Sequence, residues 1–239
     1  MKKHVTLFSS VLMMSTTLLG AGGVFADVSQ PSTPTPNEVK TPITAELTVN
    51  QTPDKPNPPI DPEGGTDKPT EIEGLFGIAY APEALSGQGR LADSGETSVE
   101  LSSNKVNSTN KHNVGVQDKT RGKDRNWSLK AQLEWDNDPN NYMAGATVTA
   151  TGCNVKLNDG EGNLSVVPED AVTIGDSGEN LTISKDSQVE IMKANLGKSV
   201  NGVYNYQFQN PKLVIQNSDK VPANTYSGNI IWNLSNAAQ

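Results

Sequence analysis

Two segments that contain tryptophan have the residue types and spacing of a surface that stacks on sugar rings. From Trp127 to Trp135 every odd position is apolar and every even position is polar. A β-strand with this sequence places Trp127, Leu129, Leu133 and Trp135 on one face, because side chains alternate along a strand. The same regular alternation is what burial of one face in a core demands, and core packing is the more usual role of such aromatics.

The second segment runs from Tyr226 to Leu234 and alternates in the same way. Its even positions place Tyr226, Ile230, Trp232 and Leu234 on one face. Gly228 has no side chain to pack, which in a strand predicts a bulge or the close approach of another group such as an aromatic ring. The two segments are therefore expected to share their local geometry.

Four cationic side chains precede the first tryptophan, namely Lys119, Arg121, Lys123 and Arg125. Such a group can bind phosphate or carboxylate anions on a partner. The alternative is a solvated loop, since a run of charges in a turn is common. Because the chain as a whole is acidic, we expect any contact of this kind to be local and weakened by salt.

The residues that usually perform catalysis are sparse. Cys153 lies in an alternating stretch that predicts a small buried residue, and His112 is the one histidine beyond residue 4, so a Cys–His or Ser–His pair is not expected. A general acid needs apolar surroundings, and alternation directs the nearest candidate, Glu134, to solvent. The oxygen-rich stretches 136–141 and 158–163 lack EF-hand spacing and are typical of turns. We expect no catalytic site, metal or cofactor.

Short strands joined by turns are expected to position these side chains. Period-two runs recur between turn clusters, and no stretch shows an apolar stripe at helical spacing. Candidate strands lie near 75–80, 112–118, 126–135, 145–157, 164–167, 180–184, 188–193, 203–208, 211–216 and 224–234. The sequence therefore predicts an all-β fold, a single β-sandwich or barrel-like domain over residues 74–239.

Two other segments are expected to precede this domain. Residues 1–26 have the basic start, apolar stretch and small residues before the cleavage point that define a signal peptide. Residues 27–73 hold most of the chain's 15 prolines and an excess of acids, which predicts a disordered Pro/Asp/Thr-rich spacer. Within that spacer, residues 43–49 alternate like a short strand that either pairs with the domain or stays loose.

Composition excludes several classes of protein. The 239 residues carry a formal net charge of −8, 34% hydrophobic residues and one cysteine. A disulfide-stapled miniprotein, a polytopic membrane protein and a zinc site of Cys and His are therefore not expected. The acidic balance also argues against a nucleic-acid partner, which would need a basic face.

The tryptophan segments together resemble a known family. The resemblance rests on Trp127-Ser128-Leu129, on Trp232-Asn233-Leu234 with Tyr226 and Ile230 ahead of it, and on the lead-in Asp118…Arg121-Gly122. These features resemble the WxL domain of surface proteins from low-GC Gram-positive bacteria. The spacer followed by residues 74–82 also resembles the start of such domains. The chain departs from the family pattern at Asn126, where glycine often stands, and in residues 235–239, which lack a proline.

This resemblance implies a function. It implies a secreted protein at the cell wall or cell surface that binds peptidoglycan without a covalent bond, in a complex with other WxL proteins and a membrane-anchored partner. The family motif residues would be Trp127, Leu129, Tyr226, Trp232 and Leu234, with the cationic loop contacting anionic wall polymers. The alternative is an adhesin or interaction module for a host matrix protein or another surface protein, bound through the spacer or an edge strand.

Overall fold

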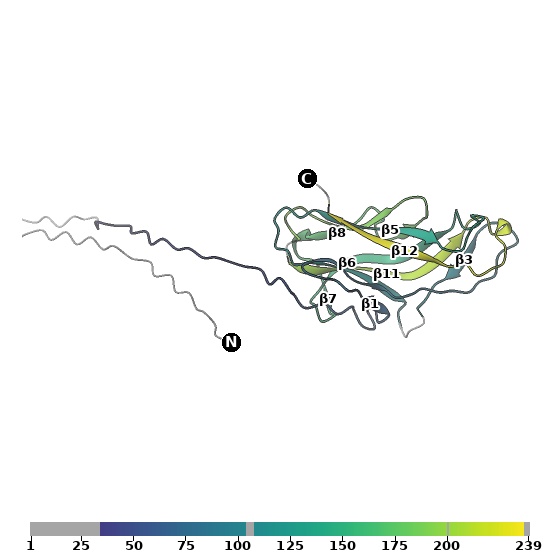
Figure 1. Cartoon of the computed structure of the whole chain (residues 1–239), viewed down its shortest axis with the longest axis horizontal. Helices are drawn as coiled ribbons and strands as arrows, with labels where there is room; N and C mark the ends of the chain where they lie inside the picture. The colour runs from purple at the N-terminus through teal and green to yellow at the C-terminus, as the bar shows by residue number, and fades with distance from the viewer. Residues whose placement is uncertain (1–33, 104–107, 200, 237–239) are drawn as a thin grey trace, which may run out of the picture. The chain divides into compact units, whose positions relative to one another are not determined.

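The chain folds as two antiparallel β-sheets that stack as layers (Figure 1). This computed structural model describes residues 34–103, 108–199 and 201–236, so the expected signal peptide lies outside the described residues. Apart from two 3₁₀ turns, Pro168–Asp170 and Ser218–Lys220, the regular structure in these ranges is β-strand. The predicted all-β fold is confirmed.

The larger sheet contains eight strands. Its order is β1 (Asp67–Pro69), β2 (Phe76–Pro82), β4 (Lys111–Asp118), β11 (Gly202–Ile215), β6 (Thr147–Asn158) and β7 (Leu164–Ser165). Two further strands join this path at its sides: β3 (Thr97–Glu100) pairs with β11, and β9 (Leu181–Ile183) pairs with β6. The long strands β4, β11 and β6 form the centre of this layer.

The smaller sheet contains four strands in the order β12 (Gly228–Asn236), β5 (Trp127–Trp135), β10 (Val189–Ala194) and β8 (Val172–Ile174). Both tryptophan segments are thus strands of one sheet and neighbours in it. The pairing of β12 with β5 is continuous over nine residue pairs with no register shift. This regularity keeps every second side chain of both strands on the same face.

Most predicted strands occur close to their expected places. The predicted pair 203–208 and 211–216 is one strand, β11, that continues through an irregularity where Asn210 has a φ of 50° and the register with β6 shifts. Strands β1, β3 and β8, which have three or four residues each, were not predicted.

The core lies between the two sheets. From β5 it receives Trp127, Leu129 and Ala131, which are completely buried, and from β11 it receives Tyr206 and Phe208. The polar residues between them on β5 are half-buried or exposed, so the predicted alternation of this strand is confirmed. Burial of several aromatics of this size supplies a large part of the hydrophobic stabilisation.

The opposite face of the large sheet is covered by a segment that leads into its first strand, β1. We call residues 56–69 the strap, which includes this covering segment and β1 itself. The compact unit begins at Leu47, so it includes chain that the sequence assigns to the spacer before residue 74. Pro56, Pro59 and Thr66 are buried, and the Asn57 N–H donates to the carbonyl of Gly160 at 2.9 Å. The strap packs here because its carboxylates meet polar groups of the sheet.

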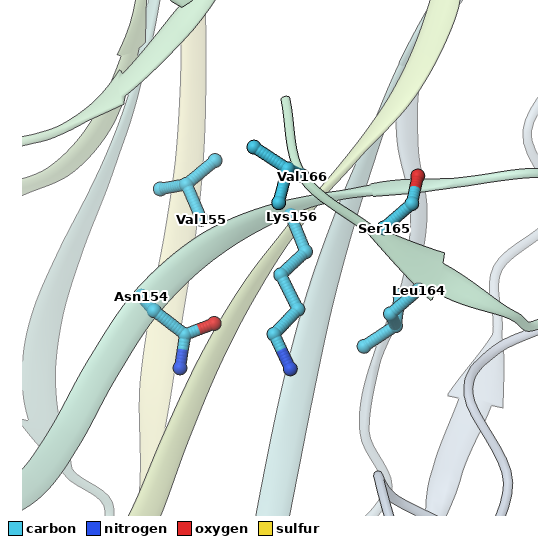
Figure 2. Close-up of a pocket in the computed structure, with 6 residues that line it drawn as sticks. All are labelled: Asn154, Val155, Lys156, Leu164, Ser165 and Val166. Atoms are coloured by element: carbon cyan, nitrogen blue, oxygen red, sulfur yellow. The ribbon is translucent and has the colours of Figure 1, made fainter. Parts of the chain in front are cut away.

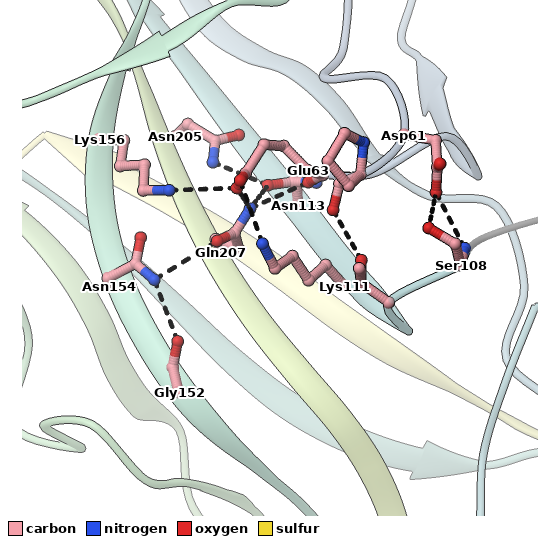
Figure 3. A network of polar contacts seen from close by, with 12 residues as sticks. Asp61, Glu63, Ser108, Lys111, Asn113, Gly152, Asn154, Lys156, Asn205 and Gln207 are labelled. Carbon is pink, nitrogen blue, oxygen red and sulfur yellow. Dashed lines mark hydrogen bonds and ion pairs between the residues drawn. The ribbon is translucent and has the colours of Figure 1, made fainter.

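Glu63 is the centre of that polar contact (Figure 3). Lys111 Nζ and Lys156 Nζ each lie 3.1 Å from its carboxylate oxygens, and Gln207 Nε2 donates to it at 2.9 Å. The hydrogen bond from Gln207 and the two lysines hold the pKa of Glu63 at about 2. Gln207 Nε2 and Asn113 Nδ2 also donate to the Glu63 backbone carbonyl, at 2.9 and 2.8 Å.

Asp67 makes the second contact of the strap. Its carboxylate accepts hydrogen bonds from the backbone N–H and the side-chain amide of Asn113, both at 2.9 Å. Burial of this carboxylate raises the pKa of Asp67 to about 6 in spite of these two hydrogen bonds. The sequence could not indicate the strap, since the amides and lysines that receive it lie far along the chain.

Candidate functional site

The two tryptophan motifs lie side by side on the inner face of the small sheet. In the antiparallel register, Leu234 stands opposite Leu129, Trp232 opposite Ala131, and Asn236 opposite Trp127. Ala131 has the smallest side chain in the alternating row of β5, so it leaves room for the indole of Trp232 beside it. The fold therefore brings together two triplets that are about a hundred residues apart in the sequence.

Trp127 is the centre of this arrangement and has no exposed surface. Its Nε1–H donates to Asp118 Oδ2 and to Ser199 Oγ, both at 3.1 Å. The rings of Tyr204 and Phe76 pack on it at centroid distances of 5.9 and 6.4 Å. A residue placed in this way holds β4, β5 and β11 together and offers no surface to a ligand.

Asp118 explains the lead-in to the first motif. It is completely buried, and Thr120 donates to its Oδ1 through both the backbone N–H at 3.2 Å and Oγ1 at 2.7 Å. Ser199 Oγ donates to Oδ2 at 3.1 Å. A buried carboxylate needs such donors to offset its lost hydration. The aspartate thus links the loop after β4 to the indole, and no sequence pattern pointed to Ser199.

Leu129 is completely buried like Trp127, whereas the three motif residues near β12 are less buried and belong to two different clusters. Trp232 and Leu234 are half-buried and pack against the main core, where the ring of Trp232 lies 6.1 Å from that of Phe208. Tyr226 packs instead on a second cluster around Met143, and its hydroxyl donates to the carbonyl of Pro222 at 3.0 Å. Five predicted site residues therefore contribute to packing, and none of them forms an exposed aromatic platform.

Gly228 shows the close approach that its place in the strand predicts. A Cβ atom at this position would lie 2.2 Å from the carbonyl oxygen of Glu134 and 3.0 Å from the ring of Trp135. Real Cβ atoms do not come so close to a backbone oxygen, so only glycine fits without movement of β5. The continuous register shows that no bulge is formed here.

The four cationic residues of the predicted basic loop lie just before β5. Arg121 and Lys123 are exposed, whereas Lys119 is half-buried. The guanidinium of Arg125 lies 4.8 Å from the centre of the Phe76 ring. One of the four cations is thus engaged in a cation–π contact within the domain. The loop therefore presents a positive surface that has Arg121 and Lys123 at its exposed part.

The outer face of the small sheet continues from this loop. On β5 it carries Ser128, Lys130 and Gln132, and on β12 it carries Asn229, Asn233 and Ser235. Asn233 pairs with Lys130 across the strands, and the hydroxyls of Ser128 and Ser235 lie 3.4 Å apart. The same face also carries Glu134 and Ile231, and the neighbouring β10 adds Glu190 and Lys193. Amides, hydroxyls and charged groups of both signs can donate and accept hydrogen bonds to a polar polymer. Alternation placed the β5 residues on this face without assigning them a role.

A separate hollow of about 300 Å³ lies on the large sheet between β6 and β7 (Figure 2). It is lined by Asn154, Val155, Lys156, Leu164, Ser165 and Val166. The Lys156 ammonium is already paired with Glu63. With its cation engaged and mostly apolar walls, the hollow offers few groups that could orient a polar ligand.

The sequence predicted no catalytic role for Cys153, His112 and Glu134, and the structure places the first two in buried surroundings. Cys153 is buried, and burial raises the pKa of its thiol above the usual value. Burial also lowers the pKa of His112 to about 4, and its ring nitrogens lie 3.3 Å from Thr66 Oγ1 and 3.0 Å from Asn110 Oδ1. Glu134 is exposed, as alternation predicts.

The two oxygen-rich stretches use their carboxylates within turns. Asp138 accepts the backbone N–H groups of Tyr142 and Met143 at 2.8 Å, and Asp159 accepts those of Glu161 and Asn163. Across the described residues, no three His, Cys, Asp or Glu side chains gather closely enough to hold a metal ion. The same part of the chain has no helix of the length and apolarity that crossing a membrane requires.

Comparison with known proteins identifies one family. A family model described as "WxL domain surface cell wall-binding" matches residues 32–237, which include the strap and both tryptophan strands. Neither a curated protein nor a solved structure matches the chain.

Proposed function

The chain belongs to the WxL family of surface cell wall-binding domains, and we propose that its ligand in the wall is peptidoglycan. As a member of this family it is a secreted protein of the cell wall or cell surface. The observation that carries the proposal is the family match over the paired tryptophan strands, whose inner face builds the core and whose outer face is polar and open.

The proposed contact surface is the outer face of the small sheet together with the basic loop. Trp127 and Leu129 are completely buried, so their proposed role is to pack β5 against the large sheet and not to contact the ligand. Lys130, Asn233 and Ser128 then lie on one surface, where they can hydrogen-bond to acetamido and peptide groups of the polymer. Arg121 and Lys123 add attraction for the anionic groups of the wall.

We propose a binding role without a catalytic step. The exposed Glu134 lacks the apolar surroundings that would make it a general acid at neutral pH. We further propose that the protein acts in a surface complex with other WxL proteins and a membrane-anchored partner, as the resemblance implies.

Co-sedimentation of the purified chain with Gram-positive sacculi tests the proposal. Sacculi are compared with and without their anionic polymers across a salt series. We expect retention on stripped peptidoglycan at high salt, because hydrogen bonds to uncharged acetamido and peptide groups are screened little by ions. No retention on either preparation would contradict peptidoglycan binding and favour a protein partner on the surface.

Matched charge changes locate the contact. We expect Lys130→Glu combined with Asn233→Asp to weaken retention on stripped sacculi at least tenfold. We expect Arg121→Ser with Lys123→Ser to reduce only the salt-sensitive part of retention. The control is Lys220→Glu combined with Asn217→Asp, which makes the same total change of charge at two exposed residues in the turn after β11. An equal loss with this control would show that net charge, and not the sheet face, decides retention.

A further inference from the structure

Strand β12 differs from every other strand that ends a sheet in the described residues. Strands β1, β3, β7, β8 and β9, which have one neighbour each, contain only two to four residues. Strand β12 has nine residues and pairs with β5 alone. Since a strand directs alternate backbone groups to its two sides, one side of β12 presents a row of N–H and C=O groups without a strand beside it.

This edge also lacks the features that usually prevent further strand pairing. Its sequence, GNIIWNLSN, contains no charged residue and no proline, and its register with β5 has no bulge. Ile230, Trp232 and Leu234 are half-buried, and among the described residues no strand pairs with β12 on their open side. Ile231 on the outer face is 40% exposed. An added strand would therefore gain both backbone hydrogen bonds and apolar contact.

The same chain contains a segment with matching properties. Residues 43–49 read ITAELTV, with apolar side chains at every second position and β-branched residues that favour strands. In the structure this segment forms no strand, and Ile43 and Leu47 are 93% and 91% exposed. Large apolar side chains exposed at strand spacing are an unfavourable arrangement for a chain that stays alone in water.

We propose that residues 43–49 of one copy add as a strand to the free edge of β12 in a second copy. The segment has four apolar positions at period two, and β12 has three on its inner face, so the two rows can close over the open side of the core. The segment carries only Glu46, and β12 is uncharged, so no like charges oppose the pairing. Main-chain hydrogen bonds would supply affinity and the apolar rows would fix the register.

This contact joins two different surfaces of the molecule, a donor segment and an acceptor edge. Each copy keeps a free donor or a free edge after the first contact, so association can extend from copy to copy along the wall. The proposal is independent of peptidoglycan binding, because it concerns the purified chain in solution and needs no wall polymer.

Sedimentation velocity of the purified chain from about 1 to 200 µM tests the proposal. We expect the mean mass to rise with concentration, and we expect Leu47→Asp and Ile231→Lys each to weaken the association at least tenfold. Both side chains are exposed, so neither change should unfold the domain. The matched control is Val39→Asp, which makes the same change at an exposed residue outside the segment. A mass of one chain throughout, or equal effects of Leu47→Asp and Val39→Asp, would overturn the proposal.

Disulfide trapping distinguishes pairing between copies from pairing within one chain. A chain with Glu46→Cys is mixed with a chain with Ile231→Cys, since both positions are central and point away from the apolar rows. The native Cys153 is buried and should not interfere. We expect a disulfide-linked pair in the mixture and little when Val39→Cys replaces Glu46→Cys. A double variant that closes its disulfide only within single chains would overturn the proposal.

Discussion

The indole of Trp127 acts as a hydrogen-bond donor inside the core. Its N–H reaches a buried carboxylate and a buried hydroxyl, whereas the indole Nε1 of Trp135, at the other end of the same strand, is buried with no partner in the described part of the chain. The two residues are identical in the sequence and opposite in their hydrogen bonding. The alternation of β5 predicted burial for both, but it could not predict this difference, because Asp118 and Ser199 come from other elements.

Substitution of each tryptophan by phenylalanine should therefore change the free energy of unfolding by different amounts. We expect Trp127→Phe to lower the free energy of unfolding by about 2 kcal/mol, because a hydrogen bond to a buried carboxylate is lost. We expect Trp135→Phe to change it by less than about 0.5 kcal/mol or to increase it, because it removes an unpaired buried donor. Urea unfolding of the two variants measures both. A large loss in Trp135→Phe would show that its N–H has a partner.

The two strap carboxylates respond to pH with opposite sign. Glu63 has a pKa of about 2 in the fold against 4.5 for the ordinary side chain, so its stabilising contribution is present above pH 4.5 and is lost as the pH falls toward 2. Asp67 has a pKa raised from 3.8 to about 6, so its protonated form is favoured in the fold. The stability that it contributes below pH 3.8 is lost as the pH rises toward 6.

Glu63→Gln isolates the first of these effects. We expect the variant to be less stable than the native chain by about 1 kcal/mol at pH 7, a modest value because the carboxylate is partly exposed and screened by solvent. The difference should shrink between pH 4.5 and pH 2, where the native carboxylate becomes protonated. Thermal unfolding across this pH range measures the difference. A difference that grows with acidity would contradict the role assigned to Lys111 and Lys156.

At the scale of elements, the pairing of β12 with β5 depends on one close contact at its start. Gly228 brings the backbone of β12 within reach of the Glu134 carbonyl. We expect Gly228→Ala to lower the free energy of unfolding by about 2 kcal/mol or more, because the new methyl group displaces β5. Gly145→Ala is the control, since a Cβ there meets nothing within 4 Å. Denaturant unfolding compares them, and equal values would contradict the assigned contact.

The elements themselves were largely predictable, since long strands with regular alternation reveal their faces. The sequence placed β5 and β12 and their apolar rows, but it gave no reason to pair them with each other. It divided β11 into two strands because the turn-like Asn210-Pro211 interrupts its pattern. Core packing was the favoured role of the tryptophans, with a sugar-binding surface as the alternative. Alternation cannot separate a buried row from an exposed one without the second sheet.

At the scale of the whole molecule, the strap decides where the folded domain begins. A chain that starts at Leu47 retains the strap. A chain that starts at Gly74 lacks it, so the sheet residues that contact Glu63 lose their partner; these are Lys111, Asn113, Lys156 and Gln207. We expect the Leu47 chain to keep the full free energy of unfolding and the Gly74 chain to lose about 3 kcal/mol or more, since several hydrogen bonds worth about 1 kcal/mol each are removed. Urea unfolding of both chains measures this. Equal stability would favour the predicted boundary at residue 73.

The place of β12 in the small sheet also has a consequence for the order of folding. Strand β5 pairs on one side with β10 and on the other with β12, and Glu134 meets its partner Asn229 only after ninety-four intervening residues of chain have been made. The contacts of Trp127 with Ser199 and Tyr204 therefore form only after these later residues have been made. Domains dominated by such distant pairings fold in milliseconds to seconds, roughly. A chain that is still unfolded during that interval can pass through an export channel that is too narrow for the folded sandwich.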